Sequence, residues 1–354
     1  MKKLGILIVC FFVVGIFFFL QKKENKTQQV LPASDSIVPT KIPKQVRDDK
    51  GQEKKFLFVP YWGQTQDKIP NEFGDMLIYF GITPSKDGID TQEPGFLGLG
   101  RFVGISEGRK TLLTIRMMDQ DTNFAIIKDK KQQEKIMTQA IVIAKQKGFS
   151  GIVLDLEISS LPFATVTDQM NKFVSDFSKS AKKNNLTFSM MFFGDTFFKL
   201  RPYDVTVLRQ YLDTVFVMAY DFSKVKGDPG PNFPFPEFTL MVQDFLNIVP
   251  KEKLVIVFGM FGYDWQVDTD GKSVGQARAV TTTVAKKQFV NQCLFKKCDV
   301  KRDKVSAETT ITYIDNQGNN HIVWFEDEES VAKKSEFLKE KGIKNVGYWA
   351  YSYF

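Results

Sequence analysis

The sequence is poor in the residues that carry much of enzyme chemistry. Its 354 residues include one histidine, His321, and three cysteines, Cys10, Cys293 and Cys298. A Ser-His-Asp triad, a Cys-His pair and most zinc sites need better-placed histidines, so these sites are largely excluded. No histidine lies near "NQCLFKKCDV", which makes a metal site there implausible and leaves a local disulfide between its two cysteines open.

The globular part of the chain also lacks an excess of positive charge. The net charge is +7, but residues 1–55 hold eleven Lys/Arg and five Asp/Glu, which leaves 37 basic and 36 acidic residues for the rest. A domain so nearly neutral has no electrostatic footprint for nucleic acid. In addition, no glycine-rich phosphate loop follows the first predicted strand, which argues against a nucleotide-binding fold.

The chain does contain a long apolar run near its N-terminus. The run "LGILIVCFFVVGIFFFL", Leu4 to Leu20, is uncharged, is long enough to span a bilayer and is followed by no A-x-A-like cleavage site. We therefore expect a membrane anchor over residues 1–21, with a cleaved export signal as the alternative. Residues 22–55 are polar and without periodicity, which indicates a flexible linker. We expect the globular part outside the cytoplasm, membrane-anchored, or secreted if the segment is cleaved.

Short apolar runs alternate with amphipathic stretches from Phe56 to the C-terminus. Residues 132–147 and 170–177 space their apolar side chains as helices do. Eight strands alternating with helices predict a (β/α)8 TIM barrel over residues 56–354, with an open doubly wound sheet as the alternative. The predicted strands are "FLFVPY" from Phe56, "DMLIYFGI" from Asp75, "TLLTIRM" from Thr111, "GIVLDLE" from Gly151, "LTFSMMFF" from Leu186, "TVFVMAY" from Thr214, "KLVIVFG" from Lys253 and "NVGYWAY" from Asn345.

One segment interrupts this alternation between the seventh strand and its helix. Residues 267–321 are polar and β-like, and "DNQGNN" is a turn signal between two strands. We expect a small α+β insertion there, followed by the helix "EESVAKKSEFLKEKG". Few residues follow the eighth strand, so another segment, such as the one beside Phe56, or a partner must cover its outer face.

Two carboxylates end the predicted fourth strand, "GIVLDLE". Side chains alternate along a strand, so Val153, Asp155 and Glu157 share one face. Active sites of such barrels lie at the C-terminal ends of the strands, where both carboxylates would face the barrel mouth. The alternative is a pair of solvated acids at the end of a strand.

Several motifs, in order along the chain, resemble glycoside hydrolase family 18. "GIVLDLE" is similar to the D-x-x-D-x-D-x-E signature of its fourth strand, and "MAYD" matches the M-x-Y-D of its sixth. "VGYWAY" places Trp349 like the tryptophan on the eighth strand. "FGYDW" and "HIVWFEDEESVAKK" resemble the bacterial spore-germination and cortex-lytic branch. The resemblance runs from about Phe56 to the end of the chain.

This resemblance implies an O-glycosyl hydrolase that cleaves β-1,4 bonds next to N-acetylglucosamine, in peptidoglycan or chitin-like polymers. Such enzymes retain configuration through substrate assistance and need no metal or cofactor. The resemblance implies Glu157 as the general acid, Asp155 as the partner of the acetamide N–H and Tyr220 as a donor to the acetamide oxygen. The candidate substrate-binding residues are Trp349, Asp221, Met218, Tyr263 and Tyr61, with core packing as the alternative for the aromatic ones.

Two positions depart from the family signature. Its first Asp is Ser150 in this chain, and its second is Val153. Valine cannot exchange a hydrogen bond with Asp155, as the second Asp of active chitinases does. The alternative function is therefore a catalytically weak or inactive protein that binds cell-wall glycan. Retention of Glu157 favours the enzyme.

Overall fold

The structure, a computed structural model, describes residues 53–106 and 108–354. The anchor predicted over residues 1–21 and nearly all of the linker predicted over 22–55 lie outside the described residues, so both stay predictions. Within the described ranges, no helix combines the length and apolar character needed to cross a membrane.

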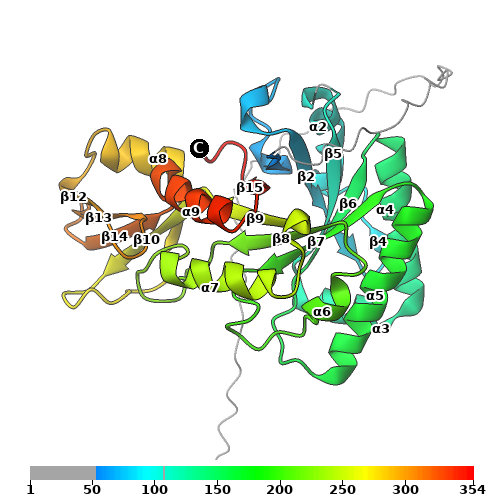
Figure 1. Cartoon of the computed structure of the whole chain (residues 1–354). Helices are drawn as coiled ribbons and strands as arrows, with labels where there is room; N and C mark the ends of the chain where they lie inside the picture. The colour runs from blue at the N-terminus through cyan, green and yellow to red at the C-terminus, as the bar shows by residue number, and fades with distance from the viewer. Residues whose placement is uncertain (1–52, 107) are drawn as a thin grey trace, which may run out of the picture. The chain divides into compact units, whose positions relative to one another are not determined.

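Eight parallel strands of the described chain close into a barrel, with helices around it (Figure 1). All eight predicted strands are confirmed, each beginning within one residue of its expected start. The fold is therefore the predicted (β/α)8 barrel, and the open doubly wound alternative is wrong. The barrel strands are β1 (Lys55–Pro60), β2 (Met76–Ile82), β5 (Thr111–Met117), β6 (Gly151–Leu156), β7 (Thr187–Phe193), β8 (Thr214–Ala219), β9 (Leu254–Gly259) and β15 (Val346–Trp349).

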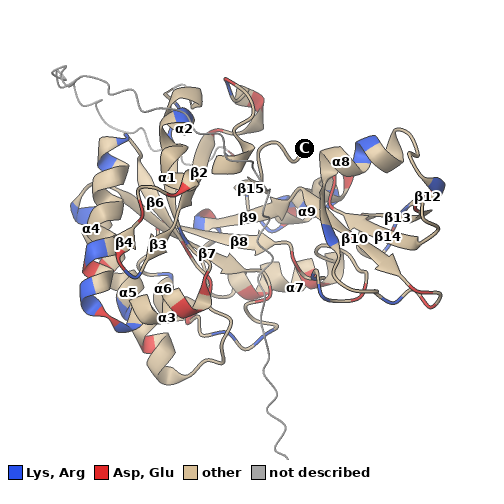
Figure 2. Cartoon of the chain, turned by 180° about the vertical axis from the view of Figure 1, so that it is seen from behind, with Lys and Arg blue, Asp and Glu red and all other residues tan. Residues whose placement is uncertain are grey.

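Helices pack on the outer face of the barrel, and acidic side chains cap several of them. Asp119 Oδ1 accepts from the Thr122 N–H at 2.8 Å, where α3 begins. The predicted helix at 132–147 lies within α4 except for its last residue, and the one at 170–177 falls within α5. Figure 2 shows basic residues, in blue, along α4. The helices, short turns and small hairpin are α1 (Pro94–Leu97), α2 (Leu99–Ile105), α3 (Gln120–Lys128), α4 (Lys130–Gln146), α5 (Ala164–Lys183), α6 (Val205–Leu208), α7 (Phe235–Leu246), α9 (Glu328–Glu340), η1 (Tyr61–Gly63), η2 (Asn71–Phe73), η3 (Lys251–Lys253), β3 (Pro84–Ser85) and β4 (Gly88–Ile89).

Between β9 and α9 the chain forms a second sheet, which is antiparallel and has the strand order β11-β10-β14-β13-β12 (Figure 1). The predicted "DNQGNN" turn joins β13 to β14, with Gly318 at φ 94°. The sheet starts before and ends after the predicted insertion at 267–321, because its first strand is apolar and reads like a continuation of β9. The elements are β10 (Phe261–Val267), β11 (Arg278–Thr281), α8 (Thr282–Ala285), η4 (Lys286–Val290), β12 (Lys296–Arg302), β13 (Thr309–Ile314) and β14 (Asn320–Phe325).

Side chains of the barrel strands alternate between the helix layer and the barrel interior. On β6, Ile152 packs in the outer layer whereas Val153 lies in the interior. Phenylalanines fill the floor of the interior, where Phe56 and Phe58 meet the ring of Phe216 edge-on at centroid distances of 5.3 and 5.8 Å. The interior is therefore a packed core, and only side chains near the C-terminal strand ends can line a pocket.

Aromatic rings cover the outer face of β15. Tyr348 contacts Phe258 and Phe354 at centroid distances of 6.2 and 5.7 Å. Phe354 in turn contacts Phe73 of η2 at 5.7 Å. Phe73 and Phe354 thus supply part of the cover of this face. The segment before Phe56 lies mostly outside the described residues, so a cover by that segment or by a partner stays a prediction.

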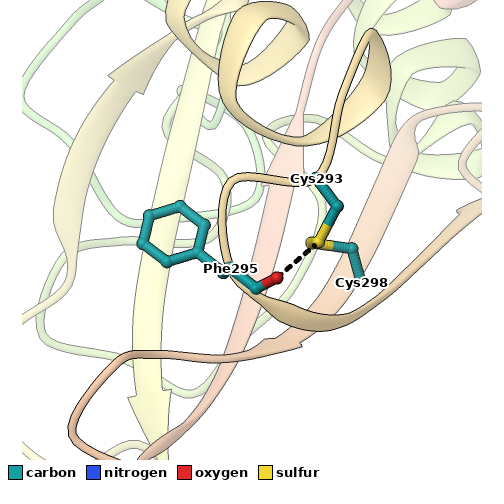
Figure 3. The surroundings of a disulfide bond; sticks show 3 residues. All are labelled: Cys293, Phe295 and Cys298. Atoms are coloured by element: carbon teal, nitrogen blue, oxygen red, sulfur yellow. Dashed lines mark hydrogen bonds between the residues drawn. A yellow bond between two sulfur atoms is a disulfide. The ribbon is translucent and has the colours of Figure 1, made fainter.

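The question left open for the cysteines is answered in the second sheet. Cys293, after η4, and Cys298, in β12, form a disulfide with a Cα–Cα distance of 5.9 Å (Figure 3). The carbonyl of Phe295 lies 3.0 Å from Cys293 Sγ, inside the small loop that the bond closes.

Candidate active site

A pocket of about 170 Å³ opens at the C-terminal ends of the barrel strands. Its lining combines three carboxylates with aromatic and methionine side chains, a mixture typical of small-ligand sites. The lining residues are Phe80, Met118, Asp155, Glu157, Met191, Phe193, Met218, Tyr220, Asp221, Phe261 and Trp349.

Strand β6 brings two of these carboxylates into the pocket. Asp155 is 2% exposed, and Glu157, directly after the strand, is half-buried. The Glu157 N–H donates to the Met117 carbonyl at 2.8 Å, and its own carbonyl accepts from Asn123 Nδ2 at 2.8 Å. These bonds hold Glu157 in register beyond the strand end. The alternative of solvated acids is therefore wrong for Asp155.

Asp155 is a buried acid that forms no salt bridge within the part of the chain that the structure describes. Among the described residues, its Oδ1 has no hydrogen-bond partner. Arg116, its neighbour across the β5–β6 pairing, is the cation that acts on it. Burial raises the pKa of Asp155 to about 7, and the positive charge of Arg116 opposes this rise. Asp155 therefore changes its ionisation near neutral pH.

Glu157 holds its proton more tightly than an ordinary glutamic acid. Burial, and then the negative charges of Asp155 and Asp221, raise its pKa well above the usual value. Arg201 and Lys224 oppose this rise. A raised pKa favours the protonated form of a carboxyl group, which a proton donor requires.

Tyr220 and Trp349 form an aromatic wall of the pocket. Their rings lie 6.4 Å apart at an angle of 29°, and Phe80 packs edge-on against Trp349 at 4.6 Å. Burial, followed by the negative charge of Asp155, raises the pKa of Tyr220 well above its usual value. The Tyr220 hydroxyl is therefore a hydrogen-bond donor over the physiological pH range.

Asp221, which follows Tyr220, has a left-handed backbone with φ 61°. Its Oδ1 accepts from the Tyr263 hydroxyl at 2.5 Å, and its N–H donates to Asn232 Oδ1 at 2.9 Å. Burial raises the pKa of Asp221, whereas the hydrogen bond from Tyr263 lowers it. Tyr263 itself is buried and contacts the pocket through Asp221.

The remaining two predicted residues lie in different places. Met218 lines the pocket. Tyr61 does not line the pocket; it packs against Trp62 at a centroid distance of 4.8 Å, and Trp62 in turn contacts the pocket-lining Trp349 at 6.3 Å. The Arg116 guanidinium lies 5.7 and 5.8 Å from the ring centroids of Tyr61 and Trp62, which gives this edge a cation–π cluster.

Sequence reasoning missed the apolar lining of the pocket other than Met218 and Trp349, and it missed the cations around Glu157. Met191 and Phe193 occupy alternate positions of β7, so the alternation applied to β6 would have found them. Arg201 and Lys224 follow β7 and β8 in loops, where no periodicity predicts which side chains face the site.

The carboxylates do not form a metal site. Within residues 53–106 and 108–354, no three His, Cys, Asp or Glu side chains are arranged to hold a metal ion. The pocket offers hydrogen-bonding and aromatic groups for an organic ligand, and three acids of differing proton affinity. The arrangement can transfer a proton to a bound molecule and stabilise positive charge beside Asp155.

Comparison with known proteins gives the same family as the motifs. The model of the glycosyl hydrolases family 18 matches residues 80–353. The chain is 25% identical over 292 residues to the cortical fragment-lytic enzyme of Bacillus anthracis, which covers 79% of this chain and 65% of the relative. It spans 66% of glycosylase YvbX and 34% of sporulation-specific glycosylase YdhD, both of Bacillus subtilis.

Solved structures share the fold. The spore cortex-lytic enzyme SleL of Bacillus cereus superposes with a TM-score of 0.68 at 20% identity, over 86% of this chain and 72% of SleL. A chitinase of Cycas revoluta, in complex with (GlcNAc)3, gives a TM-score of 0.72 at 19% identity, over 84% of this chain and 95% of the chitinase.

Proposed function

Because the chain belongs to the glycosyl hydrolases family 18, we propose that it hydrolyses β-1,4-linked glycans that contain N-acetylglucosamine, such as peptidoglycan or chitin-like polymers. Glu157 is the general acid of a retaining, substrate-assisted reaction. The observation that carries this proposal is that Asp155 and Glu157 line one pocket together with Tyr220 and Trp349, and that the pKa of Glu157 is raised there.

In the proposed first step, the acetamido oxygen of the sugar attacks the anomeric carbon. The bond to the leaving oxygen breaks, and the Glu157 carboxyl gives that oxygen its proton. Asp155, as a carboxylate, accepts the acetamide N–H and stabilises the positive oxazolinium ring, while the Tyr220 hydroxyl donates to the acetamide oxygen. Water then opens the ring, and the Glu157 carboxylate takes one of its protons.

The shape of the pocket supports binding of one sugar ring at a time. Its volume of about 170 Å³ is smaller than the ~300–1,000 Å³ of ordinary ligand sites, so most of a polymer must lie outside it. The Trp349 ring offers an apolar face for that sugar, and Asp221 a hydrogen-bond acceptor for its hydroxyls. The names of the relatives, a cortical fragment-lytic enzyme and a chitinase with bound (GlcNAc)3, support this class of substrate.

The valine at position 153, where the family signature has an Asp, favours one alternative function. Val153 lies in the apolar interior below Asp155, so Asp155 finds no hydrogen-bond partner in that direction. A protein that binds cell-wall glycan with little or no turnover would be compatible with this. We favour the enzyme because Glu157 and Tyr220 both face the pocket.

We also propose that the barrel acts on the outer side of a membrane, tethered through residues 1–21. Two features support this location: the apolar run of the sequence and the Cys293–Cys298 disulfide, a bond that is rare in reducing compartments.

Cleavage of a chromogenic chitobioside and of purified peptidoglycan tests the proposal. Relative to wild type, Glu157→Gln should lose on the order of 10²–10⁴ in turnover, because a general acid is removed. The exposed Glu134→Gln on α4 is the matched control and should keep full activity. An inactive wild type that still binds either glycan would establish the binding protein instead.

A further inference from the structure

A cluster of buried charges lies outside the pocket, where the second sheet meets α9. It consists of Glu308, Glu326 and Lys334, all 0% exposed, and we call it the junction cluster. Lys334 Nζ donates to Glu308 Oε1 at 3.1 Å and to Glu326 Oε2 at 2.5 Å. Burying two carboxylates with one ammonium is costly, and apolar residues would stabilise such a site at least as well. The cluster therefore calls for a role beyond stability.

Glu308 also reaches across to the barrel. Its Oε2 accepts from the Asn232 N–H at 2.6 Å, and its Oε1 accepts from the Phe233 N–H at 2.7 Å. Both amides belong to the loop between β8 and α7. A carboxylate just before β13 thus fixes a barrel loop that is 75 residues away in sequence.

Asn232 passes this constraint to the pocket. Its Oδ1 accepts from the Asp221 N–H at 2.9 Å, and its carbonyl accepts from the Phe222 N–H at 2.8 Å. Its Nδ2 donates to the carbonyls of Gly259 and Phe261, at 3.2 and 2.9 Å. Every polar group of Asn232 is therefore engaged, and its side chain has a single compatible orientation.

The residue at the end of this chain of contacts is held in an unfavourable backbone conformation. Asp221 has φ 61°, a value that few residues other than glycine adopt unless their surroundings impose it. In this conformation the Asp221 carboxylate lines the pocket and receives the Tyr263 hydroxyl. The bonds to Asn232 are the contacts that hold its backbone in place.

We propose that Glu308 is a positioning residue for the reaction at the barrel mouth, acting through Asn232 on Asp221. The second sheet thereby contributes to the active site although it supplies no acid to the pocket. This inference rests on the proposed function for its kinetic consequence, but its structural consequence can be measured without any substrate.

A carboxylate suits this position better than an amide. Glu308 offers two acceptor oxygens to two backbone N–H groups and to Lys334. In Glu308→Gln, one of these acceptors becomes an NH2 group facing a donor, so one bond to the 232–233 loop is lost at nearly unchanged volume. Asp327→Asn is the matched control, since Asp327 is also a buried carboxylate of this junction, bound to Arg302 at 2.7 and 2.8 Å but not to the loop.

The experiment compares Glu308→Gln, Asn232→Ala and Asp327→Asn in the full chain. Amide hydrogen exchange is measured at Asp221 and Phe222, with the Glu157 amide as internal reference, beside Tm, kcat and KM on a chitobioside. We expect on the order of tenfold faster exchange at Asp221 in the first two variants, and a drop in kcat of on the order of ten- to a hundredfold with a smaller change in KM. Asp327→Asn should lower Tm without either effect.

Asn232→Ala leaves the three side chains of the junction cluster unchanged, so it still tests the contact with Asp221 if Glu308→Gln does not fold. Unchanged exchange at Asp221 in Asn232→Ala, or equal kinetic losses in Asp327→Asn at the same Tm, would overturn the proposal. If wild type cleaves no glycan, the proposed function fails, and the exchange data alone decide whether Glu308 and Asn232 hold Asp221.

Discussion

Two groups of buried acids in this protein have opposite surroundings. At the barrel mouth, Asp155 has no hydrogen bond to its Oδ1 and no close counter-ion among the described residues. In the junction cluster, Glu308 makes hydrogen bonds through both oxygens. Burial raises the pKa of Asp155 and of Glu326 to about 7 alike. Glu326 Oε1, like Asp155 Oδ1, has no hydrogen-bond partner among the described residues, but Glu326 contacts the Lys334 ammonium through its other oxygen and does not line the pocket. A raised pKa or an unpaired oxygen therefore does not identify an active site by itself, and the comparison teaches that an open pocket and the lack of a contacting cation do.

Removal of the single cation of the junction cluster should give the largest effect on stability. Lys334→Met leaves Glu308 and Glu326 buried without an ammonium, and we expect the free energy of unfolding to fall by about 3–5 kcal/mol. Denaturant unfolding measures this change. Lys172→Met, which breaks the exposed Lys172–Asp176 pair on α5, is the control and should unfold like wild type. If both variants lost the same free energy of unfolding, the buried acids of the junction cluster would not depend on their counter-ion, and the contrast with Asp155 would not hold.

Removal of the Asp155 charge at the barrel mouth should instead increase the free energy of unfolding. Because Asp155 has a pKa of about 7 when folded and 3.8 as a free side chain, the folded state binds its proton more tightly. This contribution to stability is complete below pH 3.8 and is lost as the pH rises to about 7. Asp155→Asn should therefore increase the free energy of unfolding at pH 8 by roughly 2 kcal/mol while slowing turnover.

The measurement is denaturant unfolding of both proteins between pH 4 and pH 8. The difference between them should grow with pH, which separates Asp155 from other groups that titrate in the same range. A variant that is less stable than wild type at pH 8 would mean that Asp155 contributes to stability like the acids of the junction.

A smaller change should follow from removing the charge beside Asp155. Since Arg116 lowers the pKa of Asp155, Arg116→Met should raise it, and the acid limb of kcat/KM should move to higher pH by roughly one pH unit. Arg116→Lys keeps the charge and should stay near the wild-type profile. An acid limb that is the same in all three proteins would show that Arg116 has no electrostatic effect on the reaction.

The sequence predicted the barrel well because each element carries its own signal. Strands such as β6 are short apolar runs between turn residues, and the Asp155–Glu157 pair stands out at the end of one of them. Alternation then assigned Val153 to the interior, as the structure has it. The signals are local, and so a single strand can be read without knowledge of its neighbours.

The contacts that join the junction cluster to the pocket carried no such signal. Glu308, Asn232 and Asp221 meet only because two loops and a second sheet fold together, and their separations in sequence follow no period. The start of the second sheet was missed for a similar reason, since β10 is as apolar as a barrel strand. Tyr263 was predicted as a substrate-binding residue, and the structure places it one contact away, on Asp221.

The phenylalanine floor of the barrel affects how substrate can enter the pocket and how product can leave it. The barrel interior is closed by the rings of Phe56, Phe58 and Phe216, so the pocket has a single opening, at the C-terminal strand ends, and is not a channel. Under the proposed function, a glycan chain would lie across the opening and place one sugar in the pocket. Each cleaved fragment would leave through the opening by which the next chain enters, so product release and substrate binding would compete.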